Sequence, residues 1–342
     1  MTSERRKIVV TGASGNVGTG VLRALATELP DDEVVGVCRR PPTKGQVYQR
    51  VHWYRVDLSR STASVDLGPA MQGAHVVIHL ALAVQPIRDT RYLYRTNVLG
   101  TRAVLNAMAA AGVKQLIYAS SLGVYAPGAV EPVNESWPDS GQQTSVYSRH
   151  KVMAERLLDR FVQDHPDVAV ARFRPTLVVQ RESAWEIRSL YLGPLVPRVL
   201  LKLLRSRRLA ILPLPSGIAL QFVHADDIGD AVVRLLQRRA EGSFNLAADI
   251  LDVHALAGLV GARSVEVNPR LLRTVVSALY AARLVPVSPG WYDVAMKSPL
   301  MDTSRARNEL GWLPTRSSAE GALELLDGLA EGCVGESAAM GG

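Results

Sequence analysis

The chain has 342 residues, of which 47% are hydrophobic and 21% are charged. This composition is typical of a globular protein with a large core, built as one enlarged domain or as a main domain and a smaller one. The net charge is +7, but no run of five or more like charges occurs, which argues against a nucleic-acid partner. Two distant cysteines, Cys38 and Cys333, argue against a disulfide framework and a metal site.

The first half of the chain alternates β-branched or apolar runs with amphipathic segments. We expect strands at residues 7–10, 33–37, 51–56, 75–81, 115–120 and 168–173, and helices at residues 17–29, 90–111 and 145–163. This alternation predicts an α/β fold with a doubly wound parallel sheet, a Rossmann fold. Later in the chain, residues 226–239 predict a further helix and residues 243–246 a further strand.

A glycine turn joins the first strand to the first helix. It reads Thr11-Gly12-Ala13-Ser14-Gly15-Asn16-Val17-Gly18. Glycines let a phosphate approach the backbone, and the helix that follows presents free N–H groups and the positive end of its dipole. The segment therefore predicts a dinucleotide phosphate site, with an ordinary tight turn as the alternative.

Tyr147 and Lys151 lie four residues apart near the start of a predicted helix. Four residues advance a helix by about 400°, so the two side chains share a face. A lysine ammonium at that distance favours the phenolate and makes tyrosine a better acid or base. Ser120 and Ser121 end the preceding strand, at the sheet edge where α/β proteins bind ligands. Ser121 is suited to donate to a substrate oxygen, the alternative being that both serines only satisfy backbone groups.

Taken together, these motifs resemble the extended branch of the short-chain dehydrogenase/reductase superfamily, the NAD-dependent epimerases and dehydratases and the enzymes related to 3β-hydroxysteroid dehydrogenase. The resemblance covers roughly residues 7–325. Further matching segments are Asp57-Leu58, His79-Leu80-Ala81, residues 97–101, Arg174-Pro175, residues 222–229, residues 243–248 and residues 309–312.

The resemblance implies roles for the matching positions. Tyr147 would be the acid/base, Lys151 its partner and a ribose ligand, and Ser121 the donor to the substrate oxygen. Asn97 would be structural or part of a proton relay. The residues expected to contact the coenzyme are Gly12, Ser14, Gly15, Asn16, Val17, Gly18, Arg39, Asp57, Leu58, Leu80, Ala81, Asn97, Lys151 and Pro175.

Two departures from the family pattern bear on specificity. The second strand ends in Cys38-Arg39-Arg40 without the acidic residue usual in NAD-preferring members, so we expect NADP, with NAD as the alternative. The predicted lid over the site is apolar, which fits a small lipophilic carbonyl compound better than a diphosphate sugar; ordinary packing of a small lobe is the alternative. The lid residues are Leu190, Tyr191, Leu192, Leu195, Val196, Leu279, Tyr280, Leu284 and Trp291.

We predict a dinucleotide-binding domain at residues 1–175, completed by about residues 221–248, and a small discontinuous substrate lobe from residues 176–220 and 249–325. Residues 329–342 are rich in glycine and are expected to be disordered. The longest apolar stretches, residues 190–204 and 275–289, are too short and too interrupted to span a bilayer. With no signal-peptide pattern before the first strand, a cytoplasmic enzyme is expected.

The leading functional prediction is hydride transfer to or from a carbonyl or hydroxyl group of a small, apolar substrate. A sugar or nucleotide-sugar epimerase or dehydratase, which uses its coenzyme transiently, is the alternative. A non-catalytic NADP sensor is a weaker third hypothesis, since such proteins usually lose the tyrosine or the lysine. The long helices at residues 90–111 and 145–163 often pair across a two-fold axis in this family, so a homodimer is also considered.

Overall fold

The computed structural model describes residues 5–84, 87–193 and 196–342. Its central sheet has seven strands, all parallel, in the order β10-β6-β5-β4-β1-β2-β3. The strands are β1 (Lys7–Thr11), β2 (Glu33–Cys38), β3 (Val51–Arg55), β4 (Val76–His79), β5 (Gln115–Ala119), β6 (Ala169–Pro175) and β10 (Gly242–Leu246). The strand order reverses between β1 and β4, which is where a doubly wound sheet opens a crevice for ligands.

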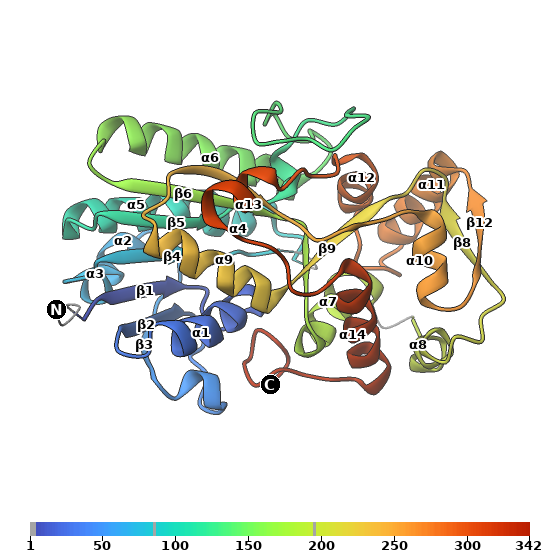
Figure 1. Cartoon of the computed structure of the whole chain (residues 1–342), viewed down its shortest axis with the longest axis horizontal. Helices are drawn as coiled ribbons and strands as arrows, with labels where there is room; N and C mark the ends of the chain where they lie inside the picture. The colour runs from blue at the N-terminus through green and yellow to red at the C-terminus, as the bar shows by residue number, and fades with distance from the viewer. Residues whose placement is uncertain (1–4, 85–86, 194–195) are drawn as a thin grey trace.

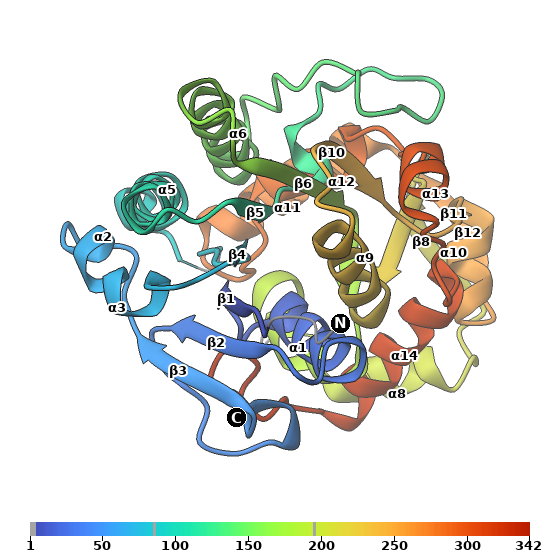
Figure 2. The same cartoon turned by 60° about the vertical axis from the view of Figure 1, so that its left-hand side comes forward.

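Helices cover both faces of this sheet (Figure 2). One face carries α1 (Asn16–Glu28) and α9 (Ala225–Gln237), and the other carries α2 (Ala63–Asp66), α3 (Gly68–Met71), α5 (Gly100–Ala111) and α6 (Val146–Asp164). Alternate side chains of β1 enter the two cores: Ile8 and Val10 pack towards α1 and α9, and Val9 packs on the opposite side. The predicted Rossmann fold is confirmed.

A smaller lobe lies beyond the carboxyl ends of the central strands (Figure 1). It contains a sheet of three strands and a parallel pair of strands. The strands are β7 (Leu177–Val179), β9 (Leu220–His224) and β11 (Ile250–Leu251), and β8 (Ile211–Pro215) with β12 (Arg263–Val267). Its helices are α7 (Ala184–Ile187), a π-helix (Arg188–Leu192), α8 (Arg198–Arg205), α10 (Val253–Leu259), α11 (Pro269–Ala281), α12 (Pro289–Lys297) and α14 (Ser318–Glu331).

Within the range assigned to the lobe, α13 (Ser304–Leu310) packs on the Rossmann domain instead. It contacts β10 and α9, and Trp312 just after it is buried in the same core. The Trp312 indole donates to the backbone oxygen of Asp227 at 2.9 Å. A long aromatic side chain with a satisfied N–H thus attaches this late segment to the first domain.

The helix expected at residues 90–111 has three parts: α4 (Thr90–Tyr94), a π-helix (Arg95–Leu99) and α5. Short 3₁₀ helices occur at Gln46–Tyr48, Leu122–Val124 and Arg181–Ser183. In the described part of the chain, no helix is both long and apolar enough to cross a membrane.

The C-terminal segment differs from the expectation of disorder. Helix α14 continues to Glu331, and the residues after it fold back onto the first domain, where Ser337 and Met340 are buried. Met340 contacts Gly335, and its sulfur accepts from the Thr19 hydroxyl at 3.4 Å. The segment is held by long-range contacts, among them those of Met340 with Thr19 and of Ser337 with Ser14, which composition does not reveal.

Candidate active site

A single cavity of about 580 Å³ extends from the glycine turn to the small lobe. This volume suits a dinucleotide together with a small second molecule. Every residue expected to contact coenzyme or substrate lines it, with the exception of Asn97. These residues belong to the turn after β1, to α1, β6 and α6, and to the segments that follow β2, β3, β4 and β5, all at one edge of the sheet.

The glycine turn has the backbone shape that a phosphate site requires. Gly12 has φ +72°, and a Cβ there would lie 2.7 Å from the Cα atom of Ala81. A Cβ at Gly18 would lie 2.5 Å from the backbone oxygen of Gly12, so a side chain is excluded at both positions. Gly15 is the N-cap of α1, and Gly15 to Gly18 line the cavity, so the first turn of the helix, with its unpaired N–H groups, borders it. The residues fit the pyrophosphate of a dinucleotide.

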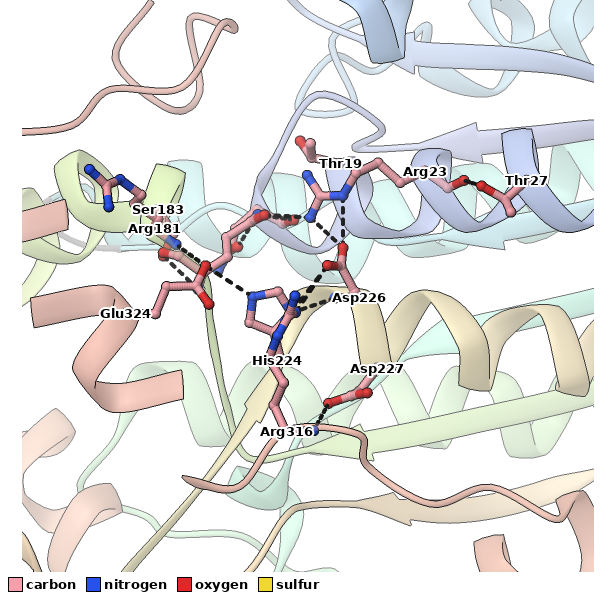
Figure 3. Close-up of polar contacts among 12 residues, drawn as sticks. Thr19, Arg23, Thr27, Arg181, Ser183, His224, Asp226, Asp227, Arg316 and Glu324 are labelled. Atoms are coloured by element: carbon pink, nitrogen blue, oxygen red, sulfur yellow. Dashed lines mark hydrogen bonds and ion pairs between the residues drawn. The ribbon is translucent and has the colours of Figure 1, made fainter. Parts of the chain in front are cut away.

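The N-terminus of α1 is held by a polar network that reaches the small lobe. The Asn16 side chain donates to the backbone oxygen of Val178 at 2.8 Å and accepts from Gln180 at 2.7 Å. Arg23 donates to Gln180 at 2.6 Å and pairs with Asp226 at 2.6 Å. Figure 3 shows Arg23 of α1 and Asp226 of α9 in a polar cluster with His224 at the end of β9, Arg316 before α14 and Glu324 on α14.

Two arginines line the cavity at the end of β2. Arg39 donates to the Tyr92 hydroxyl, and Arg40 donates to the backbone oxygen of Ala338 at 3.4 Å. Asp57, at the end of β3, accepts from the backbone and the hydroxyl of Ser59 at 2.9 and 2.7 Å. Burial acts to raise the pKa of Asp57, but these hydrogen bonds and the charge of Arg39 hold it below its usual value.

Ser121, Tyr147 and Lys151 meet in the middle of the cavity. The Ser121 side chain lies close enough to Tyr147 to lower the pKa of the phenol, and Ser121 Oγ accepts from the Gly123 backbone N–H at 3.0 Å. Lys151 is buried and donates from Nζ to the backbone oxygen of Ala119 at 2.6 Å. Because α6 is fixed to the end of β5 by Ser148, which donates to the backbone oxygen of Gly123 at 2.6 Å, these groups have little freedom to move apart.

Burial changes the proton affinity of both titrating groups. It raises the pKa of Tyr147 to about 12, against the hydrogen bond from Ser121, which lowers it. Burial lowers the pKa of Lys151 to about 7, although the carboxylate of Glu155 acts in the opposite direction. The phenol is therefore a proton donor at neutral pH, and the lysine titrates within the physiological range.

Ser120 has a structural partner next to this group. Its hydroxyl donates to Glu155, which is buried and paired with Arg174 at 2.6 Å. Arg174 also donates to the Tyr125 hydroxyl at 3.1 Å. Ser120 is thus one of the hydrogen-bond partners of this buried ion pair. It lines the cavity, but its hydroxyl is used to hold Glu155 in place.

Asn97 lies behind the wall. Its side-chain oxygen accepts from the backbone N–H of Ala83 at 2.7 Å, and its amide donates to the Ala83 oxygen at 2.8 Å. Both functional atoms are thus engaged with the loop after β4. This geometry agrees with the structural role among the two that the resemblance implies, and it does not place Asn97 against the coenzyme.

The small-lobe end of the cavity is aromatic. Trp291 stacks on Tyr147 with ring centroids 4.4 Å apart, and Tyr191 meets Trp291 edge-on at 5.4 Å. Leu190 also lines the cavity, while Leu192 and Val196 pack in the core of the lobe and Leu195 lies outside the described residues. The apolar lid is therefore partly cavity wall and partly ordinary packing.

Several wall residues were not singled out by the sequence analysis. Among them, Thr96, Thr176 and Glu186 each have a buried oxygen without a hydrogen-bond partner among the described residues. For two of them, the place in the sequence is a signal. Thr176 directly follows Pro175, and Glu186 is the one acidic residue of the four-residue helix α7.

Comparison with known proteins agrees with this geometry. The model of the NAD-dependent epimerase/dehydratase family matches residues 8–247. The chain belongs to this family. It is thus an enzyme of the short-chain dehydrogenase/reductase type.

Relatives of the family align along most of the chain. A UDP-glucose 4-epimerase of Yersinia pestis is 26% identical over 346 residues, covering 93% of this chain and 95% of that one. An uncharacterised protein of Sinorhizobium fredii is 26% identical over 267 residues, 75% of this chain, and the match spans 63% of that relative's length. A dTDP-D-glucose 4,6-dehydratase of the mouse is 22% identical over 338 residues, 92% of this chain and 86% of that one.

Solved structures share the fold. A UDP-glucose 4-epimerase of Thermotoga maritima, solved with UDP-glucose, has a TM-score of 0.70 at 18% identity over 95% of this chain and 99% of that one. A short-chain dehydrogenase/reductase superfamily protein of Agrobacterium tumefaciens, solved with bound NAD, has a TM-score of 0.68 at 24% identity over 95% of this chain and 96% of that one.

Proposed function

We propose that the chain is an NADP-dependent dehydrogenase or reductase that acts on a small, apolar carbonyl compound or alcohol. The observation that carries the proposal is the position of Ser121, Tyr147 and Lys151 between the dinucleotide half of the cavity and an aromatic half formed by Tyr191 and Trp291. When bound, the nicotinamide would supply or accept a hydride at this position.

The protein residues would handle the proton and the developing charge. Tyr147 would give its phenolic proton to the substrate oxygen during reduction, because the phenol is protonated at neutral pH. Ser121 would donate a hydrogen bond to the same oxygen and stabilise its negative charge. In its ammonium form, Lys151 would favour the phenolate that results and donate to ribose hydroxyls.

The coenzyme preference rests on the end of β2. Arg39 and Arg40 line the cavity there, with the uncharged Cys38 where NAD-preferring members carry an acidic residue. A 2′-phosphate would find guanidinium donors at this place. We expect kcat/KM to be higher with NADP than with NAD, and a ratio in favour of NAD would contradict the preference.

The alternative is a sugar or nucleotide-sugar epimerase or dehydratase, as the named relatives indicate. Spectrophotometry separates the two, since an epimerase restores its coenzyme in each cycle. Net oxidation of NADPH with ketones supports the dehydrogenase, and conversion of a sugar without net change at the nicotinamide absorbance supports the alternative. A sensor function would give coenzyme binding with neither reaction.

A further inference from the structure

One carboxyl group stands in the substrate half of the cavity. Glu186 belongs to α7 and lines the wall beside Ile187, Leu190 and Tyr191, which are apolar or aromatic. Its charge acts on the Tyr191 hydroxyl, and Tyr191 in turn contacts the Trp291 ring that stacks on Tyr147. Glu186 thus lies near Tyr191, in the small-lobe part of the cavity wall.

One oxygen of this carboxyl has no partner in the part of the chain that the structure describes. Glu186 Oε2 is shielded from solvent and has no hydrogen bond among the described residues. Arg188, two residues further on, does not line the cavity and donates from Nη2 to the backbone oxygen of Val196 at 3.3 Å. Burial alone raises the pKa of Glu186 to about 7. Buried polar groups are almost always satisfied in folded proteins, so an unpaired one in a cavity indicates a ligand group.

Two other glutamates near α7 have hydrogen-bond or ion-pair partners, in contrast to Glu186 Oε2. Glu324 accepts from the Arg181 backbone N–H at 3.2 Å, and Glu331 pairs with Arg205 at 2.9 Å. Both lie on α14, which contacts α7. The lobe therefore supplies a donor or a cation to these two glutamates, whereas Glu186 Oε2, in the cavity wall, has no such partner among the described residues.

The charge of the wall is uneven along its length. Among the described residues that line the cavity, the cationic ones are Arg39 and Arg40 at the end of β2 and Lys151 on α6. No described lining residue of the small lobe is cationic, and the one charged group there is the acidic Glu186. A second diphosphate, as in a nucleotide sugar, would meet apolar walls and a like charge instead of guanidinium groups.

We propose that Glu186 recognises the substrate, and that the substrate is a small ketone or alcohol that carries a second, hydrogen-bond-donating group, a hydroxyl or an amino group, at the end away from the reacting carbon. This assignment rests on the proposed dehydrogenase function for the orientation of the substrate. It makes Glu186 a specificity residue with no part in the proton transfer. It also separates this cavity from one that takes a nucleoside diphosphate.

Calorimetric titration of the protein saturated with NADP tests the assignment through binding alone. The probes are cyclohexanol, cyclohexane-1,4-diol, trans-4-aminocyclohexanol and UDP-glucose. We expect the diol and the amino alcohol to bind about tenfold more tightly than cyclohexanol, the ratio typical of a hydrogen bond to a charged group. UDP-glucose is expected to bind more weakly than either.

Three variants complete the test. Glu186→Leu is expected to remove the tenfold difference, and Glu186→Gln to keep part of it for the diol and lose it for the amino alcohol. Glu182→Leu changes an exposed glutamate four residues earlier that does not line the cavity, so it is expected to leave the difference intact. Melting temperatures show whether each variant is folded.

Equal binding of cyclohexanol and the diol by the wild-type protein, absence of binding included, overturns the assignment, as does tighter binding of UDP-glucose. A difference that survives in folded Glu186→Leu, or a difference for the amino alcohol that survives in folded Glu186→Gln, also overturns it. A failure of the proposed dehydrogenase function would give a different result. The diol and the amino alcohol would still bind more tightly than cyclohexanol, but ketones would cause no net oxidation of NADPH.

Discussion

The hydroxyl of Ser337 donates a hydrogen bond of 2.6 Å to the backbone oxygen of Ser14, so the C-terminal segment is attached to the glycine turn. Ala339 in the same segment lines the cavity. A segment more than 300 residues away along the chain therefore forms part of the wall beside the pyrophosphate site.

Removal of residues 333–342 should weaken coenzyme binding several-fold and lower stability. The deletion leaves the Ser14 oxygen without its donor and exposes the apolar surface that Met340 covers. Ser337→Ala alone should lower the free energy of unfolding by about 1 kcal/mol, the usual contribution of one hydrogen bond.

Urea denaturation measures the change in stability, and titration with NADPH measures the change in coenzyme affinity. Val334→Ala, at an exposed position of the same segment, is the control; unchanged affinity in the deletion variant would mean that the segment has no part in the site.

Gly12→Ala should destabilise the fold and abolish coenzyme binding. The positive φ costs a side chain about 1–2 kcal/mol, and the added Cβ would lie 2.7 Å from the Ala81 backbone. Gly258→Ala is the matched control, because Gly258 lies inside α10 with nothing within 4 Å of a Cβ. That change should stabilise the protein by about 0.5–1 kcal/mol through helix propensity. Thermal unfolding with and without NADPH distinguishes them, and coenzyme binding by folded Gly12→Ala would contradict the assignment of the turn.

The pH dependence should follow Lys151. Burial lowers the pKa of this lysine to about 7, so its ammonium form is present below that pH and is lost above it. The Tyr147 phenol, with a pKa raised to about 12, stays protonated over the same range. We expect kcat/KM for ketone reduction and the affinity for NADPH to fall together as the pH rises through about 7. Lys151→Arg, which remains charged, should remove that fall; a wild-type profile that is flat between about pH 5 and about pH 9 would show that the ammonium is not required.

Local patterns carried much of the fold prediction. The strands and helices of the Rossmann domain follow from hydrophobic periodicity, and the glycine turn and the Tyr147–Lys151 spacing fix which residues meet at the edge of the sheet. These signals are local. They nevertheless predict which residues lie close together, because the carboxyl ends of parallel strands share one edge of the sheet.

Long-range packing accounts for what the sequence did not show. The burial of Met340 depends on contacts with Thr19 and Gly335 that no window of sequence contains. The sequence predicted that Asn97 contacts the coenzyme, whereas in the structure its side-chain amide is hydrogen-bonded to the backbone of Ala83. In the sequence, Glu186 cannot be distinguished from a solvated glutamate, and only the fold places it in a cavity wall among apolar residues.

The central claim is that Tyr147 transfers the proton during net hydride transfer. The most direct measurement compares Tyr147→Phe with the wild-type protein in two assays on the same preparation: NADPH affinity by titration, and NADPH oxidation with a panel of small cyclic ketones. We predict an affinity within about twofold of the wild-type value and a fall in kcat of about 10²–10⁴-fold, the usual contribution of a general acid. Undiminished oxidation of NADPH by Tyr147→Phe would contradict the claim.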